Sequence, residues 1–149
     1  MRVVRLTQHT DYSLRVLMYL GLTTEKLVTI QEISDNHDIS RNHLMKVVQR
    51  LARSGYVQAV RGKRGGLRLS RDARLIKVGD VVRDLEPDLA LVECMRAENH
   101  CVITPACRLT AVMHSAQEAF VDALNRFTIS DLLAGRTSSQ MITLLNIGD

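Results

Sequence analysis

Three cysteines in a short polar segment are the residues of this chain best suited to metal chemistry. Cys94, Cys101 and Cys107 are the only cysteines among 149 residues, and they lie within a stretch of fourteen. An odd number does not suit closed disulfide pairing, whereas it suits a metal centre that takes a further ligand from elsewhere. The charged and polar residues between them argue against a buried structural role for all three thiols.

The spacing of the cysteines, Cys-x6-Cys-x5-Cys, favours an iron–sulfur cluster over a zinc ion. Zinc ribbons and fingers use tight Cys-x2-Cys pairs, while wider spacing lets thiolates surround a larger inorganic core. Zinc binding and thiol redox chemistry stay open as alternatives, although the Cys-x2-Cys pair typical of thiol oxidoreductases is missing. An oxygen or nitrogen donor would complete the set and would be its labile member; the candidates are Asp11, Glu93, Glu98, His100 and His114.

The composition predicts a helical core and a cytoplasmic location. Apolar residues make up 46% of the chain but aromatic residues only 3%, with no Trp. A core of Leu, Val, Ile and Ala suits helix packing. No run of about 18 apolar residues is long enough to cross a membrane. Residues 1–7 lead directly into a polar segment, so we expect no signal peptide.

The positive charge is concentrated in one block, which indicates a nucleic-acid partner. Residues 41–74 contain ten Lys and Arg against the single acid Asp72, a net charge of +9. Residues 1–40 sum to −1 and residues 75–149 to −4. A basic block within an acidic remainder is typical of proteins that bind the phosphate backbone. A merely solvated charged face is the alternative, and it is less favoured because the block coincides with a structural motif.

That motif is a winged helix-turn-helix domain, predicted over residues 1–86. Apolar residues recur at helical spacing over residues 9–22. Thr29 and Glu32 form a capping box for a second helix over residues 30–37. Ser40 is placed to cap a third helix over residues 41–54, which Gly55 ends.

Two short strands joined by a basic, glycine-rich tip follow the third helix. Residues 56–60 and 67–69 read as strands, and the tip between them is Arg-Gly-Lys-Arg-Gly-Gly. Glycine permits the positive φ values that a hairpin tip requires. The tip lacks the spacing and the Ser/Thr of a nucleotide-binding loop. We therefore predict a wing that lies along a groove of DNA.

The remainder of the chain divides into three predicted segments. A helix over residues 76–86 completes the DNA-binding domain, and a cysteine loop spans residues 87–107. Residues 108–133 form a dimerisation segment, because the helix over residues 108–127 carries a longer apolar stripe than one small domain can cover. Residues 134–149 read as a loosening C-terminal tail. The predicted fold class is mainly α with a small β wing.

The helix-turn-helix and the wing supply the candidate DNA contacts. The first turns of the third helix are best placed for base edges, its later arginines for phosphates, and the wing for the minor groove. These candidates are Ser40, Arg41, Asn42, His43, Lys46, Arg50, Arg53, Arg61, Gly62, Lys63 and Arg64.

Several of these segments resemble the iron–sulfur winged-helix transcription regulators. The resemblance rests on residues 6–15, on the wing over residues 61–67 and on Val-Gly-Asp-Val-Val over residues 78–82. The loop His-Cys-Val-Ile-Thr-Pro-Ala-Cys-Arg-Leu at 100–109 and residues 127–132 are most similar to the nitric-oxide-sensing repressors of that family. The resemblance extends from Leu6 to about Leu133.

The resemblance implies a specific site and a specific signal. Cys94, Cys101 and Cys107 would ligate a [4Fe-4S] or [2Fe-2S] cluster, and Asp11 of the partner subunit would complete it. Regulators of cluster biogenesis use a histidine three residues after the last cysteine; this chain has Thr110 there. The implied protein is a homodimeric repressor, not an enzyme, that releases palindromic double-stranded DNA when nitric oxide attacks the cluster. An iron- or redox-responsive regulator and a zinc-stabilised module remain the alternatives.

Overall fold

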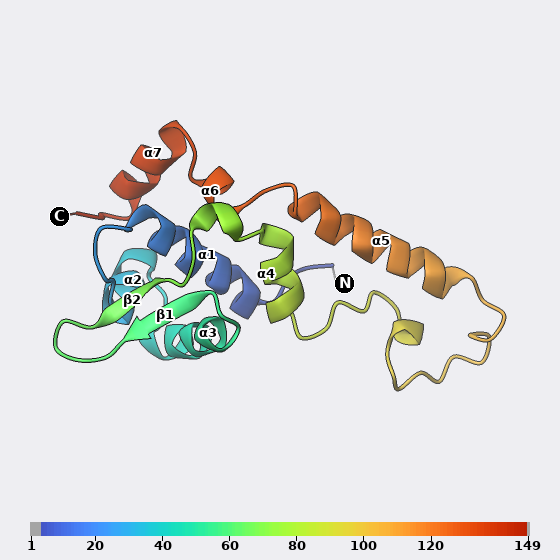
Figure 1. The fold of residues 1–149 in the computed structure, drawn as a ribbon. Helices are drawn as coiled ribbons and strands as arrows, with labels where there is room; N and C mark the ends of the chain where they lie inside the picture. The colour runs from blue at the N-terminus through green and yellow to red at the C-terminus, as the bar shows by residue number, and fades with distance from the viewer. Residues whose placement is uncertain (1–3, 149) are drawn as a thin grey trace.

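The computed structural model describes residues 4–148 and is mainly helical, with one two-stranded sheet. Figure 1 shows a body built from most of the elements, from which one helix projects with a long loop at its far end. The predicted fold class is therefore confirmed. Residues 1–3 and 149, which belong to the predicted DNA-binding domain and tail, lie outside the described residues. In chain order the elements are α1 (Gln8–Leu22), α2 (Ile30–His37), α3 (Arg41–Arg53), β1 (Val57–Val60), β2 (Gly66–Leu69), α4 (Val78–Leu85), α5 (Leu109–Leu124), α6 (Ile129–Leu132) and α7 (Arg136–Leu144), with short 3-10 turns at Ala73–Leu75 and Glu93–Met95.

The second and third helices of the DNA-binding domain begin at the predicted residues, whereas α1 begins one residue earlier, at Gln8, and α4 two residues later, at Val78. Thr7 caps α1, and the Thr29–Glu32 capping box opens α2 with both of its hydrogen bonds formed. Ser40 caps α3 by accepting the His43 backbone N–H at 3.1 Å. Each cap satisfies a backbone N–H that the first turn of a helix would otherwise leave unpaired.

The wing is an antiparallel hairpin that is joined to the helices by a third extended segment. Its register pairs Val57 with Leu69 and Val60 with Gly66. Val28, which precedes α2, exchanges backbone hydrogen bonds with Leu67 at 3.0 and 2.7 Å. Gly62 at the tip has φ of +113°, which an L side chain rarely adopts. The hydrogen bonds to Val28 hold strand β2 of the hairpin against the helix-turn-helix.

One aliphatic core supports the helix-turn-helix and α4. The fully buried side chains include Leu17 of α1, Ile33 of α2, Leu44 and Leu51 of α3, and Val81 of α4. Ile129 of α6 is also fully buried, and it extends the core toward the C-terminal part of the chain. Burial of such aliphatic groups is the main stabilising contribution in a domain with so few aromatic residues.

The projecting helix α5 is joined to the body at its C-terminal end. The Asn125 side chain accepts the Asp80 N–H at 2.8 Å and donates to the Asp80 carboxylate at 3.0 Å. Gly79 brings the α4 backbone directly against Val121 and Asn125. The apolar stripe predicts a helix that continues to Phe127, but α5 ends at Leu124, because the chain then turns and Phe127 accepts the Val78 backbone N–H at 3.0 Å.

The C-terminal segment is more ordered than predicted. Residues 134–149 were expected to loosen, yet Arg136–Leu144 form helix α7. In Figure 1 this helix lies beside α6 and the end of α1. Leu145 and Ile147, which follow it, are partly buried against the core. These two apolar residues therefore pack on the core, while Leu144 stays exposed. In the part of the chain that the structure describes, no helix is both long and apolar enough to cross a membrane.

A histidine at the C-terminal end of α2 makes the stability of this domain sensitive to pH. The His37 Nε2 atom is buried without a hydrogen-bond partner among the described residues, and burial, with Arg15 nearby, lowers the pKa of the imidazole. The folded state thus favours neutral His37, while the unfolded state binds a proton more readily below about pH 6.5.

We therefore expect the free energy of unfolding to fall as the pH decreases from about 7 toward 5. Replacing His37 with Leu will make this decrease shallower. Urea unfolding of both proteins at several pH values measures the effect. Equal slopes for the two proteins would show that His37 does not titrate on unfolding.

Candidate metal centre and nucleic-acid interface

The predicted base-reading residues lie on the exposed side of α3. Arg41, Asn42 and Lys46 are exposed and His43 is half-buried, while Leu44 on the opposite side is fully buried. This division follows from the helical period, which places apolar residues of α3 on one face and polar residues on the other. The exposed face can therefore enter a groove of DNA without disturbing the core.

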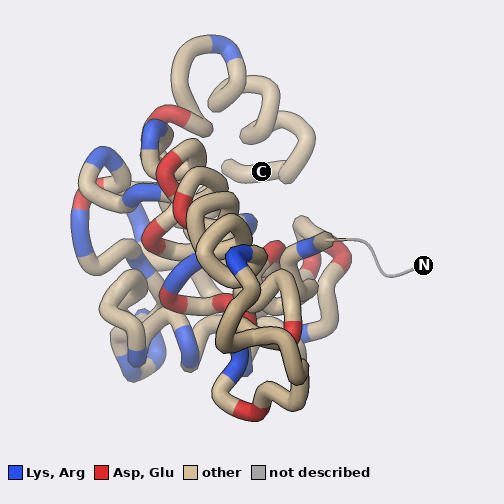
Figure 2. The backbone as a smooth tube through the Cα atoms, turned by 90° about the vertical axis from the view of Figure 1, so that its right-hand side faces the viewer, with Lys and Arg blue, Asp and Glu red and all other residues tan. Residues whose placement is uncertain are grey.

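Acids among the described residues do not neutralise the cations of α3 and of the wing tip. Arg61, Lys63 and Arg64 are exposed, and none of the ion pairs found among residues 4–148 involves them or a cation of α3. Arg74 differs, because it pairs with Asp72 at 2.8 Å. In Figure 2, α5 and the cysteine loop face the viewer and are mostly tan. The positive surface thus belongs to the helix-turn-helix and its wing.

A polar joint connects α3, the wing and α4. The Tyr56 hydroxyl donates a hydrogen bond to the Asp84 carboxylate, and Arg50 donates to the Asp84 backbone carbonyl at 3.2 Å. Arg71 lies over the Tyr56 ring at 4.9 Å from its centroid. Burial, together with Asp84, raises the pKa of the Tyr56 hydroxyl above its usual value, so it stays protonated. Arg50, predicted to bind phosphate, therefore also fixes α3 to α4.

The structure places the three cysteines at the end of the molecule to which α5 projects (Figure 1). All three are free thiols; Cys101 is exposed, and Cys94 and Cys107 are half-buried. At the N-terminus of α5, Cys107 Sγ accepts the Leu109 backbone N–H at 3.4 Å. Cys94 Sγ accepts the Thr110 hydroxyl at 2.9 Å. Two of the three sulfur atoms thus lie at the same helix end.

The donor chemistry of this loop fits an iron–sulfur group. Three free thiols supply the ligands that such groups require, and hydrogen-bond donors directed at sulfur are typical of their surroundings. The single chain does not gather them: within residues 4–148, no three Cys, His, Asp or Glu side chains are close enough to hold a metal ion. Binding would therefore require the loop to bring exposed Cys101 toward Cys94 and Cys107.

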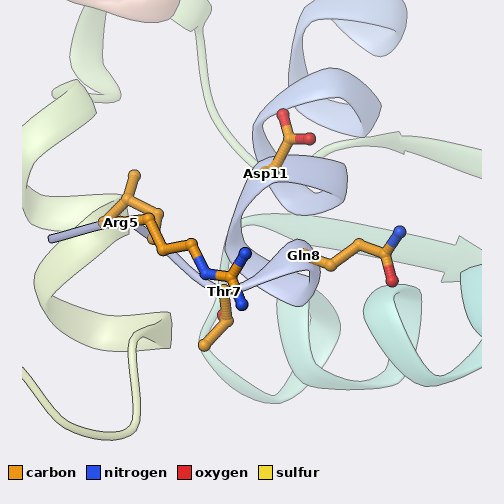
Figure 3. A pocket seen from close by; sticks show the side chains of 5 residues that line it. Arg5, Thr7, Gln8 and Asp11 are labelled. Carbon is orange, nitrogen blue, oxygen red and sulfur yellow. The ribbon is translucent and has the colours of Figure 1, made fainter. Parts of the chain in front are cut away.

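The predicted fourth ligand, Asp11, lies in the first turn of α1. It lines an open pocket together with Arg5, Thr7 and Gln8, and Figure 3 shows its carboxylate pointing away from the side chains of these three residues. None of the three cysteines lines this pocket. Asp11 is half-exposed and binds Arg15, with Nη2 and Oδ2 separated by 2.8 Å. The carboxylate is therefore accessible to a second molecule, and its bond to Arg15 is an exposed pair of small net stability.

Glu86 makes a structural contact that the sequence did not reveal. Its carboxylate accepts the Thr7 backbone N–H at 3.2 Å and the Thr10 hydroxyl at 2.6 Å. It thereby joins the last residue before the cysteine loop to the first turn of α1, close to Asp11. The partners are 76 and 79 residues apart in the sequence, so no local pattern could have predicted the contact.

The fold and its exposed basic helix and wing define a winged helix-turn-helix transcription regulator. A family model described as "Rrf2: Iron-dependent Transcriptional regulator" matches residues 6–135. The chain therefore belongs to the Rrf2 family of transcription regulators.

Individual relatives agree with this assignment. The HTH-type transcriptional regulator NsrR of Bacillus licheniformis is 45% identical over 132 residues, which cover 87% of this chain and 92% of that protein. The structure of T. potens IscR has a TM-score of 0.69 at 24% identity and covers 87% of this chain and 86% of its own. Oxidized CymR of Staphylococcus aureus has a TM-score of 0.70 at 20% identity, with 89% and 98% covered.

The two solved structures support the fold, and the family model and the sequence relative support the function class. The predicted resemblance to the iron–sulfur winged-helix regulators is confirmed. The prediction that the chain is no enzyme is also confirmed, because its matched relatives are transcription regulators.

Proposed function

We propose that the chain is a cytoplasmic, homodimeric repressor that senses nitric oxide through an iron–sulfur cluster and releases palindromic DNA in response. The observation that carries the proposal is the position of three free thiols at the outer end of a projecting helix. Three free thiols in a polar loop are suited to binding an iron–sulfur group. The name of the Bacillus licheniformis relative and the iron dependence printed for the family support the same interpretation.

The dimer is supported by the apolar side chains that α5 leaves uncovered. Val121 is the residue of this helix that the chain buries, while Leu109, Val112 and Phe120 are 44%, 59% and 45% exposed. Large apolar side chains gathered on one projecting element mark an interaction site. A second copy, packed along α5 by a two-fold axis, covers the same face on both subunits.

The proposed ligands are Cys94, Cys101 and Cys107 of one subunit and Asp11 of the partner subunit. The thiols come from the loop next to α5, and the carboxylate comes from the accessible pocket at the start of α1. A bound cluster supplies iron that reacts with nitric oxide. The ligand residues connect the loop of one subunit to the DNA-binding domain of the other.

A movement of the cysteine loop can be transmitted directly to the DNA-binding domain. Pro87 begins the loop immediately after Glu86, whose carboxylate holds Thr7 and Thr10 at the start of α1. Displacement of the loop therefore acts on α1, which packs against α3 in the core. The spacing of the two α3 helices decides whether both fit successive major grooves, so a small shift releases the operator.

On DNA, the proposed contacts divide by position. Arg41, Asn42, His43 and Lys46 read base edges; Ser40, Arg50 and Arg53 lie near phosphates; and Arg61, Gly62, Lys63 and Arg64 follow the minor groove. The division is supported by the exposure of these residues, all exposed except the half-buried His43, and by the lack of ion pairs to them among residues 4–148.

The proposal is tested by purifying the protein without oxygen, recording its absorption spectrum, and titrating operator binding with nitric oxide. A visible sulfur-to-iron absorption band and a loss of DNA affinity at a few equivalents of nitric oxide are expected. A colourless protein that binds DNA with unchanged affinity would contradict the proposal. A colourless, air-stable protein that contains zinc would instead support a zinc-stabilised module.

A second function within the family is an iron- or redox-responsive regulator. The iron dependence in the family description favours it, since iron supply then determines cluster occupancy. The two functions differ in their signal. Release of DNA by an iron chelator, with no response to nitric oxide, would select this alternative.

A further inference from the structure

A series of four side chains connects the candidate ligand of α1 with the DNA-reading turn of α3. His43 lies in the first turn of α3, and its ring meets the Tyr12 ring edge-on, with centroids 4.8 Å apart and planes at 65°. Tyr12 belongs to α1, outside the recognition helix. Such an edge-to-face pair stabilises one relative orientation of the two rings. The position of His43 is therefore determined partly by α1.

The Tyr12 ring is itself held from two other sides. The Arg15 guanidinium carbon lies 5.3 Å from the ring centroid, and Gln8 Nε2 donates to the Tyr12 hydroxyl at 2.7 Å. Arg15 also makes two hydrogen bonds to Asp11, Nε to Oδ1 at 3.2 Å and Nη2 to Oδ2 at 2.8 Å. The direction of the guanidinium plane over Tyr12 is thus set by the Asp11 carboxylate.

We infer that Tyr12 is a positioning residue for His43, and that the orientation it imposes depends on what the Asp11 carboxylate binds. This inference rests on the proposed function, because it gives Asp11 a ligand other than Arg15. A carboxylate engaged elsewhere no longer fixes the Arg15 guanidinium. The cation then changes its position over the Tyr12 ring, and the ring that contacts His43 is free to tilt.

The consequence is a change in sequence discrimination rather than in general DNA affinity. His43 is placed to contact a base edge, whereas phosphate contacts supply the affinity for any duplex. Altered orientation of His43 therefore affects binding to the operator and leaves binding to an unrelated duplex unchanged. A structural role for Tyr12 alone would affect both kinds of DNA together.

The test compares Tyr12→Phe with Tyr12→Leu in the full-length protein, with and without cluster. The DNA probes are a palindromic duplex selected by the wild-type protein from a randomised pool and an unrelated duplex of equal length. Tyr12→Phe keeps the ring and should retain the ratio of the two affinities within about twofold. Tyr12→Leu should lower that ratio about fivefold, as expected when one aromatic pair is removed, with unchanged affinity for the unrelated duplex. An unchanged ratio in Tyr12→Leu would overturn the inference.

A second measurement does not depend on cluster loading or on the stability of Tyr12→Leu. In cluster-free protein, Asp11→Asn removes the charge that holds Arg15, and it should shift the NMR signals of the His43 ring. His114 on α5 supplies an internal control whose signals should stay in place. If the His43 signals also stay in place, the inference is wrong. Wild-type protein that binds no cluster while His43 does respond to Asp11→Asn would refute the proposed function and leave the Tyr12 contact established.

Discussion

Replacing Arg61, Lys63 and Arg64 together with alanine is expected to weaken DNA binding about a hundredfold at low salt. The three cations lie at the exposed tip of the wing and have no acidic partner among the described residues. Each cation that neutralises a phosphate releases counterions when DNA binds, so its removal reduces the salt dependence of the affinity. The slope of log affinity against log salt should become shallower by roughly 0.9 for each phosphate that the variant no longer neutralises.

The matched control removes the same charge from a different surface. Lys77, Arg126 and Arg136 are exposed and lie outside the basic block of residues 41–74. Their triple replacement with alanine should change the salt slope little, because these residues are not placed to touch DNA. Fluorescence anisotropy at several salt concentrations measures both variants. Equal decreases in affinity for the two variants would mean that net charge, rather than the wing, determines binding.

Replacing Gly79 with alanine is expected to lower the free energy of unfolding by about 3 kcal/mol. This loss is near the upper end of the range expected when a side chain is enlarged in a packed interior. A methyl group at this position would overlap the Val121 backbone carbonyl and the Asn125 side chain. The Val121 carbonyl belongs to the α5 backbone and cannot rotate away. The substitution therefore separates α4 from α5, although alanine is intrinsically the better helix former.

Gly21→Ala is the matched control for this prediction, because Gly21 also lies within a helix. A methyl group there would meet the tip of the Leu133 side chain at 2.6 Å, and that side chain can rotate away. We expect Gly21→Ala to change stability by less than about 1 kcal/mol, since the gain in helix propensity offsets the repacking. Urea unfolding followed by circular dichroism compares the two variants. Similar stability in both would show that α4 and α5 are not tightly packed at Gly79.

Local chemistry explains why the DNA-binding domain could be predicted from the sequence. Thr29 with Glu32, Ser40 and Gly55 mark helix ends through hydrogen bonds or backbone angles that involve only neighbouring residues. The wing could be predicted equally well, because glycines and alternating apolar residues are local signals. The position of each element in the sequence therefore required no knowledge of the folded chain.

Most of the missed features depend on residues distant in the sequence. The end of α5 is determined by the contact between Asn125 and Asp80, and the apolar stripe alone predicted a longer helix. Helix α7 was missed because its polar composition gave no strong periodic signal, while its following residues Leu145 and Ile147 pack on the core. The contact of Glu86 was missed because its partners come from the opposite end of the domain.

The residue types of the candidate site could be predicted from the sequence, whereas their arrangement in space could not. Spacing placed Cys94, Cys101 and Cys107 in one loop, and the structure adds that Cys94 and Cys107 share the N-terminal end of α5. In the proposed function, a bound cluster brings the three thiols together, and a local pattern does not describe that convergence. The contact of Tyr12 with His43 likewise became apparent only when α1 and α3 were seen together.

In the proposed function, a cluster held by the three thiols controls DNA binding. The most direct test is operator affinity, measured without oxygen before and after nitric oxide, for wild-type protein and a Cys94→Ser, Cys101→Ser, Cys107→Ser variant. Nitric oxide should lower the affinity of the wild type at least tenfold, whereas the variant should be colourless and have one weak affinity under both conditions. A variant that binds the operator as tightly as the wild type and is released by nitric oxide to the same extent would contradict the proposed function.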